Sequence, residues 1–291
     1  MTFRKDVTSE GSRARTGGGG RAVALGGGGI GTLLLVGLYL FMGGDIGSLG
    51  QLTAPEQEVH GESGTLEHCR TGEDANAYDD CRVMFTALSV DDVWREQLSA
   101  QAGITYTEPT PVLFEGATQS GCGIAQSATG PFYCPRDNSA YFDTSFFSQL
   151  DQLGGDSGPL AQMYVVAHEY GHHIQNLEGT LGLSDYNDPG ADSNAVKIEL
   201  QADCYAGLWA HYADQGEDAY LEPITEEQVQ QAVDTARAIG DDNIQQQSGR
   251  EVQPDSWTHG SSKQRQQAFM AGYTSGRMST CDTLERGGYT N

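Results

Sequence analysis

The stretch VVAHEYGHHIQNLEG, Val165 to Gly179, holds three of the chain's seven histidines within six residues. His168 and His172 are four residues apart, so in an α-helix both imidazoles lie on one face and can reach a single metal ion. Glu169 follows the first histidine directly, which completes the H-E-x-x-H pattern of two zinc ligands and a general base. The alternative is an ordinary helix with solvated surface histidines. We favour a metal site with zinc, although two histidines and a carboxylate also accept other divalent ions.

Two other residues of this stretch carry separate interpretations. His173 lies about 100° around the helix from His172 and points elsewhere, so we assign it no part in the metal site. Gly171 costs a helix interior about 1 kcal/mol relative to alanine. A glycine at such a position often marks the close approach of another backbone or a ligand.

A catalytic zinc site needs a third protein ligand and an open fourth position. The stretch SNAVKIELQADCYAGLWAHYA, residues 193–213, is predicted to be a helix that Asp192 or Ser193 caps. Glu199 and Asp203 are four residues apart and share a face of it. We predict that Glu199 is the third ligand and that Asp203 accepts the free ring N–H of a ligand histidine. Two solvated acids are the alternative, and the weaker candidates for the third ligand are Asp192, Glu178 and His211.

The chain resembles a known family at these residues. H-E-x-x-H followed by E-x-x-x-D on a second helix is the gluzincin arrangement of zinc peptidases, and the chain is similar to the neutral zinc metallopeptidase family of bacterial membrane-anchored proteins. The resemblance covers most of the chain from about Cys69 onward, and an N-terminal membrane segment. It implies a zincin-like fold, one Zn²⁺ per chain and a peptide or protein substrate. The matching segments are GCGIAQSATGPFYCPRDNSAYFD (121–143), AHEYGHHIQ (167–175), ELQADCYAGLWA (199–210), AIGDDNIQ (238–245) and THGSSKQRQQAFMAGY (258–273).

The ligand set and the base imply a mechanism of peptide hydrolysis. Zinc held by His168, His172 and Glu199 would lower the pKa of its bound water to about 7. Glu169 would take a proton as the water attacks a peptide carbonyl, and then pass it to the leaving amine.

A further donor is expected to stabilise the developing oxyanion. The family resemblance makes His259 our catalytic candidate, with a core or capping role as the alternative. Asp241 and Asp242 lie in another matching segment, where they have no assigned role beyond a helix end near Gly240. The rival donors are Tyr170, Tyr205 and Tyr273.

The segment NSAYFD, Asn138 to Asp143, precedes the zinc helix and is predicted to be a strand. In the gluzincins that the chain resembles, a strand in this position forms the edge of the cleft. An edge strand can bind an extended peptide by adding it to the sheet. A purely structural strand is the alternative. We predict substrate binding along Ser139, Ala140, Tyr141 and Phe142.

Residues 22–42 carry no charge, and their length suits one membrane-spanning helix. Asp45 is the first charge that follows them. The positive-inside rule then predicts a single-pass membrane protein with a cytoplasmic N-terminus and the rest of the chain outside. A cleaved signal peptide and a glycine-rich segment that does not span are the alternatives. Five basic residues precede the segment: Arg4, Lys5, Arg13, Arg15 and Arg21.

Six cysteines, all beyond that segment, agree with disulfides in an oxidising compartment. Six cysteines allow 15 connectivities, and the sequence alone does not choose among them. Our expectation is that the close pairs form, Cys69 with Cys81 and Cys122 with Cys134, which leaves Cys204 with Cys281. The alternative is a free, buried thiol at Cys204. The chain has no C-x-x-C pair, so we expect no cysteine zinc site.

The charge of the chain bears on its partners. It carries 16 basic and 40 acidic residues, a formal net charge of −24. A domain this acidic repels nucleic acid, so we expect no nucleic-acid partner. The charge could favour basic substrates, and a solvated acidic surface is the simpler interpretation.

We expect four parts: a disordered basic cytoplasmic tail (1–21), a transmembrane helix (22–42), a linker (43–66) and a zinc metallopeptidase domain (67–291). Helices are predicted at 91–102, 225–239 with a Thr-x-x-Gln capping box, and 264–273, and strands at 111–116 and within 131–143. This mix indicates an α+β fold, rich in helix with a small sheet.

Two functions from different classes fit these observations. The first is a membrane-anchored zinc endopeptidase. The second is a membrane-anchored binding or scaffolding protein whose zinc is only structural. Glu169 favours the enzyme, because a structural zinc site has no need of a base.

Overall fold

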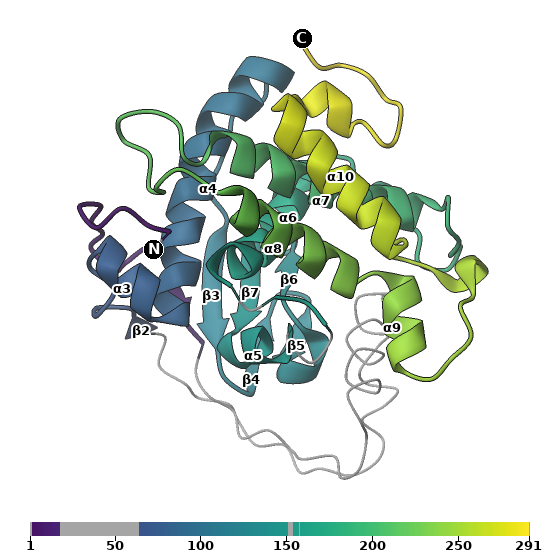
Figure 1. Ribbon diagram of the computed structural model, residues 1–291, viewed down its shortest axis with the longest axis horizontal. Helices are drawn as coiled ribbons and strands as arrows, with labels where there is room; N and C mark the ends of the chain where they lie inside the picture. The colour runs from purple at the N-terminus through teal and green to yellow at the C-terminus, as the bar shows by residue number, and fades with distance from the viewer. Residues whose placement is uncertain (1, 18–63, 151–153, 157, 291) are drawn as a thin grey trace.

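The computed structural model describes residues 2–17, 64–150, 154–156 and 158–290 (Figure 1). These residues form a helix-rich α+β fold with a small sheet, which confirms the predicted fold class. In this described part of the chain, no helix is both long and apolar enough to cross a membrane. Residues 22–42, for which we predicted a membrane-spanning helix, lie outside it.

The main sheet has five strands in the order β2-β1-β3-β7-β6. β3 is parallel to both β1 and β7, whereas β6 is antiparallel to β7 and β2 to β1. β-branched and aromatic residues, which favour strands, are prominent in β3 and β7. A separate hairpin, which the sequence analysis did not predict, joins β4 (Ala117–Ser120) to β5 (Gly123–Gln126). The strands of the main sheet are β1 (Arg15–Thr16), β2 (Gly64–Thr65), β3 (Thr110–Phe114), β6 (Phe132–Cys134) and β7 (Ser139–Asp143).

The position of β7 overturns the predicted substrate strand. β7 lies between β3 and β6, so both of its backbone edges are already paired. All five of its residues are buried, as expected for an inner strand covered on both faces. Ser139, Ala140, Tyr141 and Phe142 therefore do not form a cleft edge, and the prediction that they bind a peptide by strand addition is wrong. The outer strand on that side is β6, which packs against α6 (Pro159–Glu178).

Helices cover the sheet and enclose α6 (Figure 1). α6 packs on α4, α7 and α8, and α10 packs along the other side of α7. α4 begins at Asp79, twelve residues before the predicted start, where two acidic residues in its first turn suit the helix dipole. The predicted Thr225–Gln228 capping box is present at α8. The other helices are α3 (Gly72–Ala77), α4 (Asp79–Ala102), α5 (Phe147–Leu150), α7 (Asn194–Tyr212), α8 (Glu226–Ala238), α9 (Asp241–Gln247) and α10 (Ser262–Ser275).

α6 is the central helix of the core. Every residue from Leu160 to Gln175 is buried, so its polar side chains must find partners inside the protein. Gly171 allows α7 to come close, because a Cβ at this position would lie 2.9 Å from the Cα of Ala202. The approach of a second backbone, expected from the glycine, is therefore present.

Three disulfides connect the six cysteines, in the pairs that we expected. Cys69 is joined to Cys81, Cys122 to Cys134, and Cys204 to Cys281. The third bond links α7 to the C-terminal region, so Cys204 is not a free thiol.

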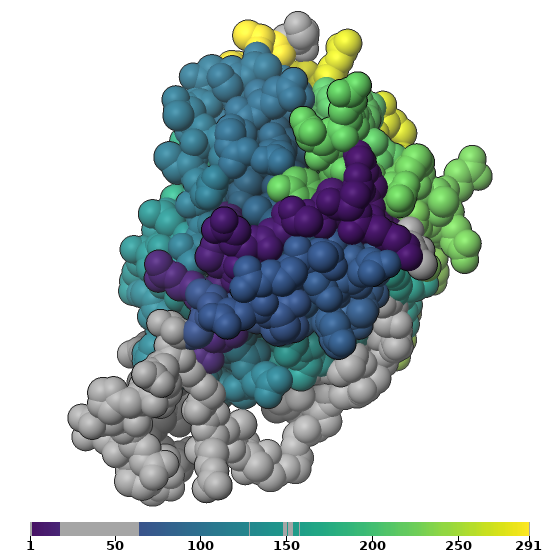
Figure 2. Space-filling view, turned by 90° about the vertical axis from the view of Figure 1, so that its left-hand side faces the viewer, coloured from purple at the N-terminus to yellow at the C-terminus, as the bar shows by residue number. Residues whose placement is uncertain are grey.

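Residues 2–17 differ from the disordered tail that their composition predicted. Phe3 and Ala14 are completely buried, and β1 is an inner strand of the sheet. Figure 2 shows this segment in purple, lying across the blue surface around α3 and α4. The prediction of disorder from composition is wrong for this segment because a few buried apolar residues and backbone hydrogen bonds hold it in place.

Candidate active site

The side chains of His168, His172 and Glu199 converge between α6 and α7. His168 Nε2 lies 3.2 Å from Glu199 Oε2, and His172 Nε2 lies 3.6 Å from Glu199 Oε1. All three residues are buried. α6 supplies both histidines at its i and i+4 positions, and α7 supplies the acid.

These separations fit a zinc ion. Tetrahedral coordination with bonds of about 2.0–2.1 Å places neighbouring ligand atoms about 3.3 Å apart. The ligand atoms of the three residues lie within 4.8 Å of one another. Two imidazoles and a carboxylate form a zinc-type donor set, and three protein ligands leave a fourth position open, as in catalytic sites.

Asp203 binds the His168 ring at Nδ1, the nitrogen that does not face Glu199. Its Oδ1 lies 2.8 Å from His168 Nδ1, which leaves Nε2 directed at the site. Asp203 also accepts hydrogen bonds from Tyr164 and, through both oxygens, from Arg265 at 2.8 and 2.9 Å. Burial opposes charge on the His168 ring, but Asp203 outweighs it and raises the pKa of His168 to about 10 in the absence of metal. A histidine ligand backed by a carboxylate is oriented and made more basic.

Gln175 orients the ring of His172, and the sequence analysis missed it. Gln175 Oε1 lies 2.8 Å from His172 Nδ1. The Gln175 amide is itself fixed, because it donates to the Ile198 carbonyl oxygen at 2.7 Å and to Gln201 at 3.1 Å. Its position three residues after His172 on the same helix was the available signal.

The Glu169 carboxylate is buried next to the ligands. Its Oε2 has no hydrogen-bond partner among the described residues. Burial raises the pKa of Glu169, while the charges of His168 and His172 lower it. A buried carboxylate oxygen without a partner is costly for folding, so its presence points to a chemical use.

His259 lies near the ligands, on the loop between α9 and α10. Interaction with Glu199 raises the pKa of His259 against the effect of burial, and about a fifth of its side chain, 22%, is exposed. Asp241 fixes this loop, since its Oδ2 accepts backbone N–H groups of Thr258, His259 and Gly260 at 2.9, 2.7 and 3.0 Å. Asp242 in turn accepts from the backbone N–H of Ser262 at 2.7 Å. The two aspartates of the AIGDDNIQ segment thus hold the loop that carries His259.

Tyr186 is a second residue that the sequence analysis missed. Its hydroxyl donates to Glu199 Oε1 at 3.2 Å. It comes from the segment between α6 and α7, which has no periodic pattern that could have marked it. A hydrogen bond from Gly190 N–H to the Trp257 carbonyl oxygen, 2.8 Å, ties this segment to the loop of His259.

The three tyrosines named as rival donors are engaged elsewhere. Tyr170 accepts from Arg13 at 3.3 Å and is completely buried. Tyr205 donates to Glu178, and Tyr273 stacks on Phe269.

The remaining candidate ligands also lie outside the group. Glu178 accepts from Tyr205 and Tyr289, His211 Nδ1 lies 2.7 Å from the Tyr273 carbonyl oxygen, and Asp192 is exposed. His173 points away from the ligands, as expected: its ring lies 3.0 Å from the Tyr133 hydroxyl and 2.6 Å from the Thr107 carbonyl oxygen.

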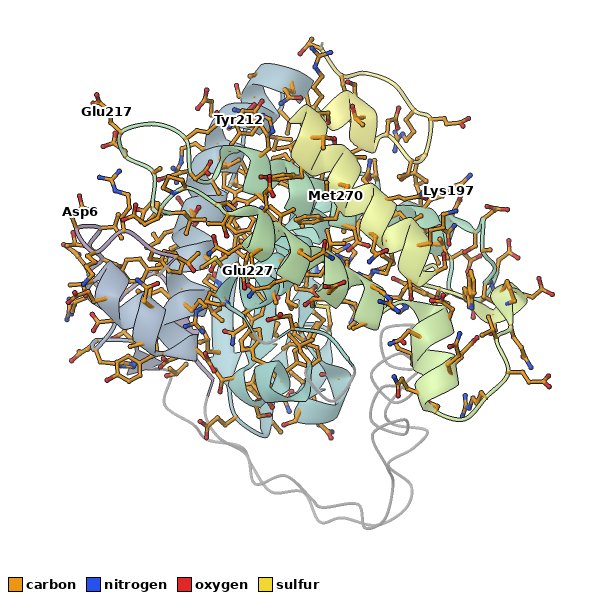
Figure 3. All side chains as sticks on the ribbon, in the orientation of Figure 1. Asp6, Lys197, Tyr212, Glu217, Glu227 and Met270 are labelled. Carbon is orange, nitrogen blue, oxygen red and sulfur yellow. A yellow bond between two sulfur atoms is a disulfide. The ribbon has the colours of Figure 1, made fainter. Side chains whose placement is uncertain are left out.

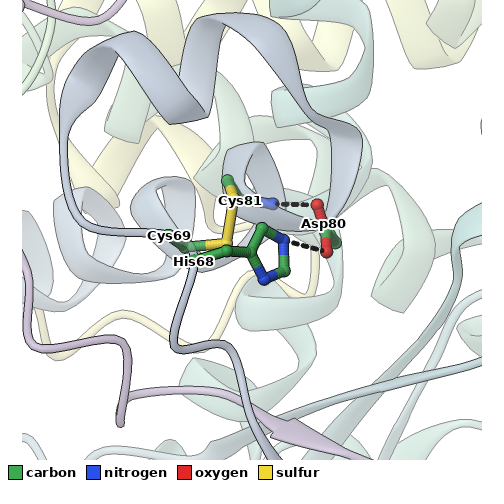
Figure 4. A group of neighbouring side chains, drawn as sticks. All are labelled: His68, Cys69, Asp80 and Cys81. Atoms are coloured by element: carbon green, nitrogen blue, oxygen red, sulfur yellow. Dashed lines mark hydrogen bonds and ion pairs between the residues drawn. A yellow bond between two sulfur atoms is a disulfide. The ribbon is translucent and has the colours of Figure 1, made fainter.

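A second group of metal-ligating residues lies near α3, formed by His68, Cys69, Asp80 and Cys81 (Figure 4). Its two sulfurs are joined in a disulfide, and His68 Nε2 lies 2.9 Å from Asp80 Oδ2. Zinc binds the thiolate form of cysteine, which a disulfide does not offer. The expectation of no cysteine zinc site therefore agrees with this group as long as the disulfide is intact.

Comparison with known proteins agrees with the site. The family described as "Putative neutral zinc metallopeptidase" matches residues 4–284. The chain is 50% identical over 225 residues to the uncharacterized protein Rv2575 of Mycobacterium tuberculosis (strain ATCC 25618 / H37Rv), which covers 75% of each chain. It is 44% identical over 202 residues to the uncharacterized protein YpfJ of Escherichia coli (strain K12), with 67% of this chain and 68% of YpfJ covered. No solved structure matches it. The match along nearly the whole chain shows that this protein belongs to the neutral zinc metallopeptidase family.

Proposed function

We propose that this chain hydrolyses peptide bonds in peptide or protein substrates, with one zinc ion held by His168, His172 and Glu199. Zinc in a site of this composition acts as a Lewis acid on a carbonyl group and lowers the pKa of water to about 7. The family membership and the convergence of the three ligands support this proposal.

Glu169 serves as the general base. It follows a ligand on the same helix, it is buried, and its Oε2 has no partner among the described residues. That unpaired oxygen is the observation that carries the proposal, because it is a buried acceptor beside the ligands that no other described group occupies. Glu169 accepts a proton from the attacking water and returns it to the leaving amine.

His259 and Tyr186 are the candidates to stabilise the developing oxyanion. Tyr186 donates to Glu199, the charge of His259 interacts with that of Glu199, and both residues come from loops, where donors can face an incoming substrate. The loop of His259 is fixed by Asp241, which gives that histidine the better-defined position. We therefore keep His259 as the first candidate and add Tyr186 as the second.

The three disulfides suit an oxidising compartment, so we place the domain outside the cytoplasm. Residues 22–42, predicted above as a membrane anchor, lie outside the described residues, and which side of a membrane each part of the chain occupies is taken up in the next subsection.

The scaffolding alternative is less well supported. Structural zinc sites are closed by four protein ligands, whereas the described group has three. A structural site also gives no reason to bury an unpaired acid beside the ligands.

The test compares full-length wild type with Glu169→Gln. Both are purified, their metal is measured by elemental analysis, and their cleavage of a proteome-derived peptide library is followed by mass spectrometry. We expect one zinc per chain in both, with cleavage slowed by about 10²–10⁴-fold in the variant. Glu178→Gln is the matched control, since it makes the same change on the same helix away from the ligands, and it should cleave like wild type. Zinc in both proteins with cleavage by neither would favour the scaffold, and equal cleavage by both would remove Glu169 from the mechanism.

A further inference from the structure

Residues 2–17, which we call the N-terminal arm, are bound along their whole length to residues 64–290. β1 of the arm lies between β2 and β3, so the arm supplies an inner strand of the main sheet. Main-chain carbonyl groups of the arm accept hydrogen bonds from backbone N–H groups of the domain at three separate places. These pairs are Thr2 with Glu222 (2.9 Å), Val7 with Gly72 (2.9 Å) and Gly11 with Leu66 (3.0 Å).

The arm also contributes to the hydrophobic core. Phe3 is completely buried, and its ring packs edge to face on Phe85 of α4, with centroids 5.8 Å apart. The Asn76 side chain accepts from the N–H groups of Thr2 and Phe3 at 2.9 and 3.0 Å, and donates to the Phe3 carbonyl oxygen at 2.9 Å. A loosely attached tail would not bury an aromatic ring and satisfy its backbone in this way.

Arg13 of the arm contacts α6, the helix that carries His168 and His172. Its guanidinium donates to Asp91 at 2.7 Å, to the Pro109 carbonyl oxygen at 2.8 Å and to the Tyr170 hydroxyl at 3.3 Å. Tyr170 lies on α6, directly after Glu169. Asp91 is 1% exposed, and among the described residues its cationic partner is Arg13. Without the arm, this carboxylate would be buried without a counter-charge, which is strongly disfavoured.

The domain has a glycine where the arm requires it. A Cβ on Gly72 would lie only 1.9 Å from the carbonyl oxygen of Arg4, so any side chain at this position would push the arm away. The family match begins at residue 4 and therefore includes most of the arm.

We propose that the N-terminal arm is a fixed part of the zinc domain and lies on the same side of any membrane as that domain. A single membrane crossing between residues 17 and 64 would place the arm and the domain in different compartments, where none of these contacts could form. The topology predicted from the sequence, with a cytoplasmic N-terminus and an external domain, is therefore incompatible with this fold within one chain. The inference does not depend on the proposed peptidase activity.

Cysteine labelling in intact cells tests the sidedness. All six native cysteines are in disulfides, so a new cysteine provides the one reactive thiol. Asp6→Cys reports on the arm and Glu227→Cys on the domain, because both side chains are exposed; both are labelled in Figure 3. Full-length variants are treated with a membrane-impermeant maleimide before or after lysis. We expect both variants to react under the same condition. Reaction of one in intact cells and of the other only after lysis would overturn the proposal.

A cross-link tests the contact itself. Arg15 and Thr65 are directly opposite each other on antiparallel strands, where Cβ atoms lie about 4.5–5.5 Å apart. In the full-length double variant Arg15→Cys/Thr65→Cys, a short thiol cross-linker should join the two residues within one chain, as seen in tryptic peptides by mass spectrometry. Asp6→Cys/Thr65→Cys is the matched control and should remain unlinked. Absence of the link, or a link found only between two chains, would contradict an arm that packs on its own domain.

Discussion

Among the residues that the structure describes, two groups of side chains have metal-ligating atoms within 4.8 Å of one another: His168, His172 and Glu199, and the group around His68. The first offers two imidazoles and a carboxylate, which can bind a metal ion when the imidazoles are neutral. In the second, both sulfurs are joined to each other, which leaves His68 and Asp80 as donors. The ligating atoms are thus within the same distance of one another in both groups, while their chemical availability differs.

The surroundings of the histidines also favour the first group as a metal site. His168 and His172 are buried, and each has its second nitrogen fixed, by Asp203 and by Gln175. The side chain of His68 is 54% exposed, and its Nε2 lies 2.9 Å from Asp80 Oδ2. A metal site therefore requires fixed, available donors, and proximity alone does not identify one.

The largest effect is expected from removing a ligand in the first group. His172→Ala should lose its zinc, with affinity lowered more than 100-fold, because changes behind a ligand already cost about 10–100-fold. Peptide cleavage should fall to background. The measurement is elemental analysis after dialysis, together with the cleavage assay. His68→Ala is the control in the second group and should keep one zinc and full activity, so zinc loss in that control would reverse the comparison.

The next effect concerns the acids of the two groups. Asp203→Asn should weaken zinc binding about 10–100-fold. It should also lower the free energy of unfolding by about 3–5 kcal/mol, because Arg265 would become a buried charge without its counter-charge. Asp80→Asn makes the same change in the second group, where an exposed pair contributes about 0–1 kcal/mol. Chemical denaturation and zinc titration of both variants measure these differences. Equal effects in the two variants would show that burial does not distinguish the groups.

The disulfide of the second group should act on stability alone. Replacing both Cys69 and Cys81 by serine should lower the free energy of unfolding by about 2–4 kcal/mol, since a 12-residue separation gives a loop of moderate entropy. The zinc content should remain one per chain. Denaturation and elemental analysis of the same sample measure both quantities, and a loss of zinc would assign the metal to the second group.

The smallest effect is expected from Glu178, an acid on α6 that lies outside the first group and should therefore affect stability without affecting zinc. Burial raises the pKa of Glu178 to about 7, partly offset by its hydrogen bonds from Tyr205 and Tyr289. The folded form then keeps its proton at pH values where the unfolded form has lost it, so the contribution of Glu178 to stability is present below about pH 4.5 and is lost as the pH rises to about 7. Glu178→Gln cannot ionise and should escape this loss.

The stability difference between Glu178→Gln and wild type should therefore move in favour of the variant by on the order of 1 kcal/mol between pH 4.5 and 7.5. Denaturation at a series of pH values measures it, with zinc bound throughout. A constant difference across that range would mean that Glu178 is ionised in the fold.

The grouping of the candidate ligands could be predicted because helical spacing is local. The i, i+4 relation places His168 with His172, and again Glu199 with Asp203, whatever the rest of the chain does. The structure brings these two helical faces together, with Gly171 allowing the close approach. Two of the disulfide pairs followed from a separation of 12 residues, and the third, between Cys204 and Cys281, was the pair that remained.

The features that the sequence did not predict depend on long-range packing. The strand at Ser139–Asp143 was found, but its place between β3 and β6 depends on pairing with residues elsewhere in the chain. Tyr186 reaches Glu199 from an irregular segment that has no periodicity. The N-terminal arm has the composition of a disordered segment, and its order comes from contacts with residues distant in sequence, such as Thr2 with Asn76 and Arg13 with Asp91.

The most direct test of the central claim is an X-ray absorption spectrum at the zinc edge of the oxidised, full-length protein. A zinc ion held by His168, His172 and Glu199 should show nitrogen and oxygen neighbours at about 2.0–2.1 Å, and no sulfur. The spectrum should be unchanged in His68→Ala. A sulfur shell at about 2.3 Å would place the metal at cysteine and contradict the account.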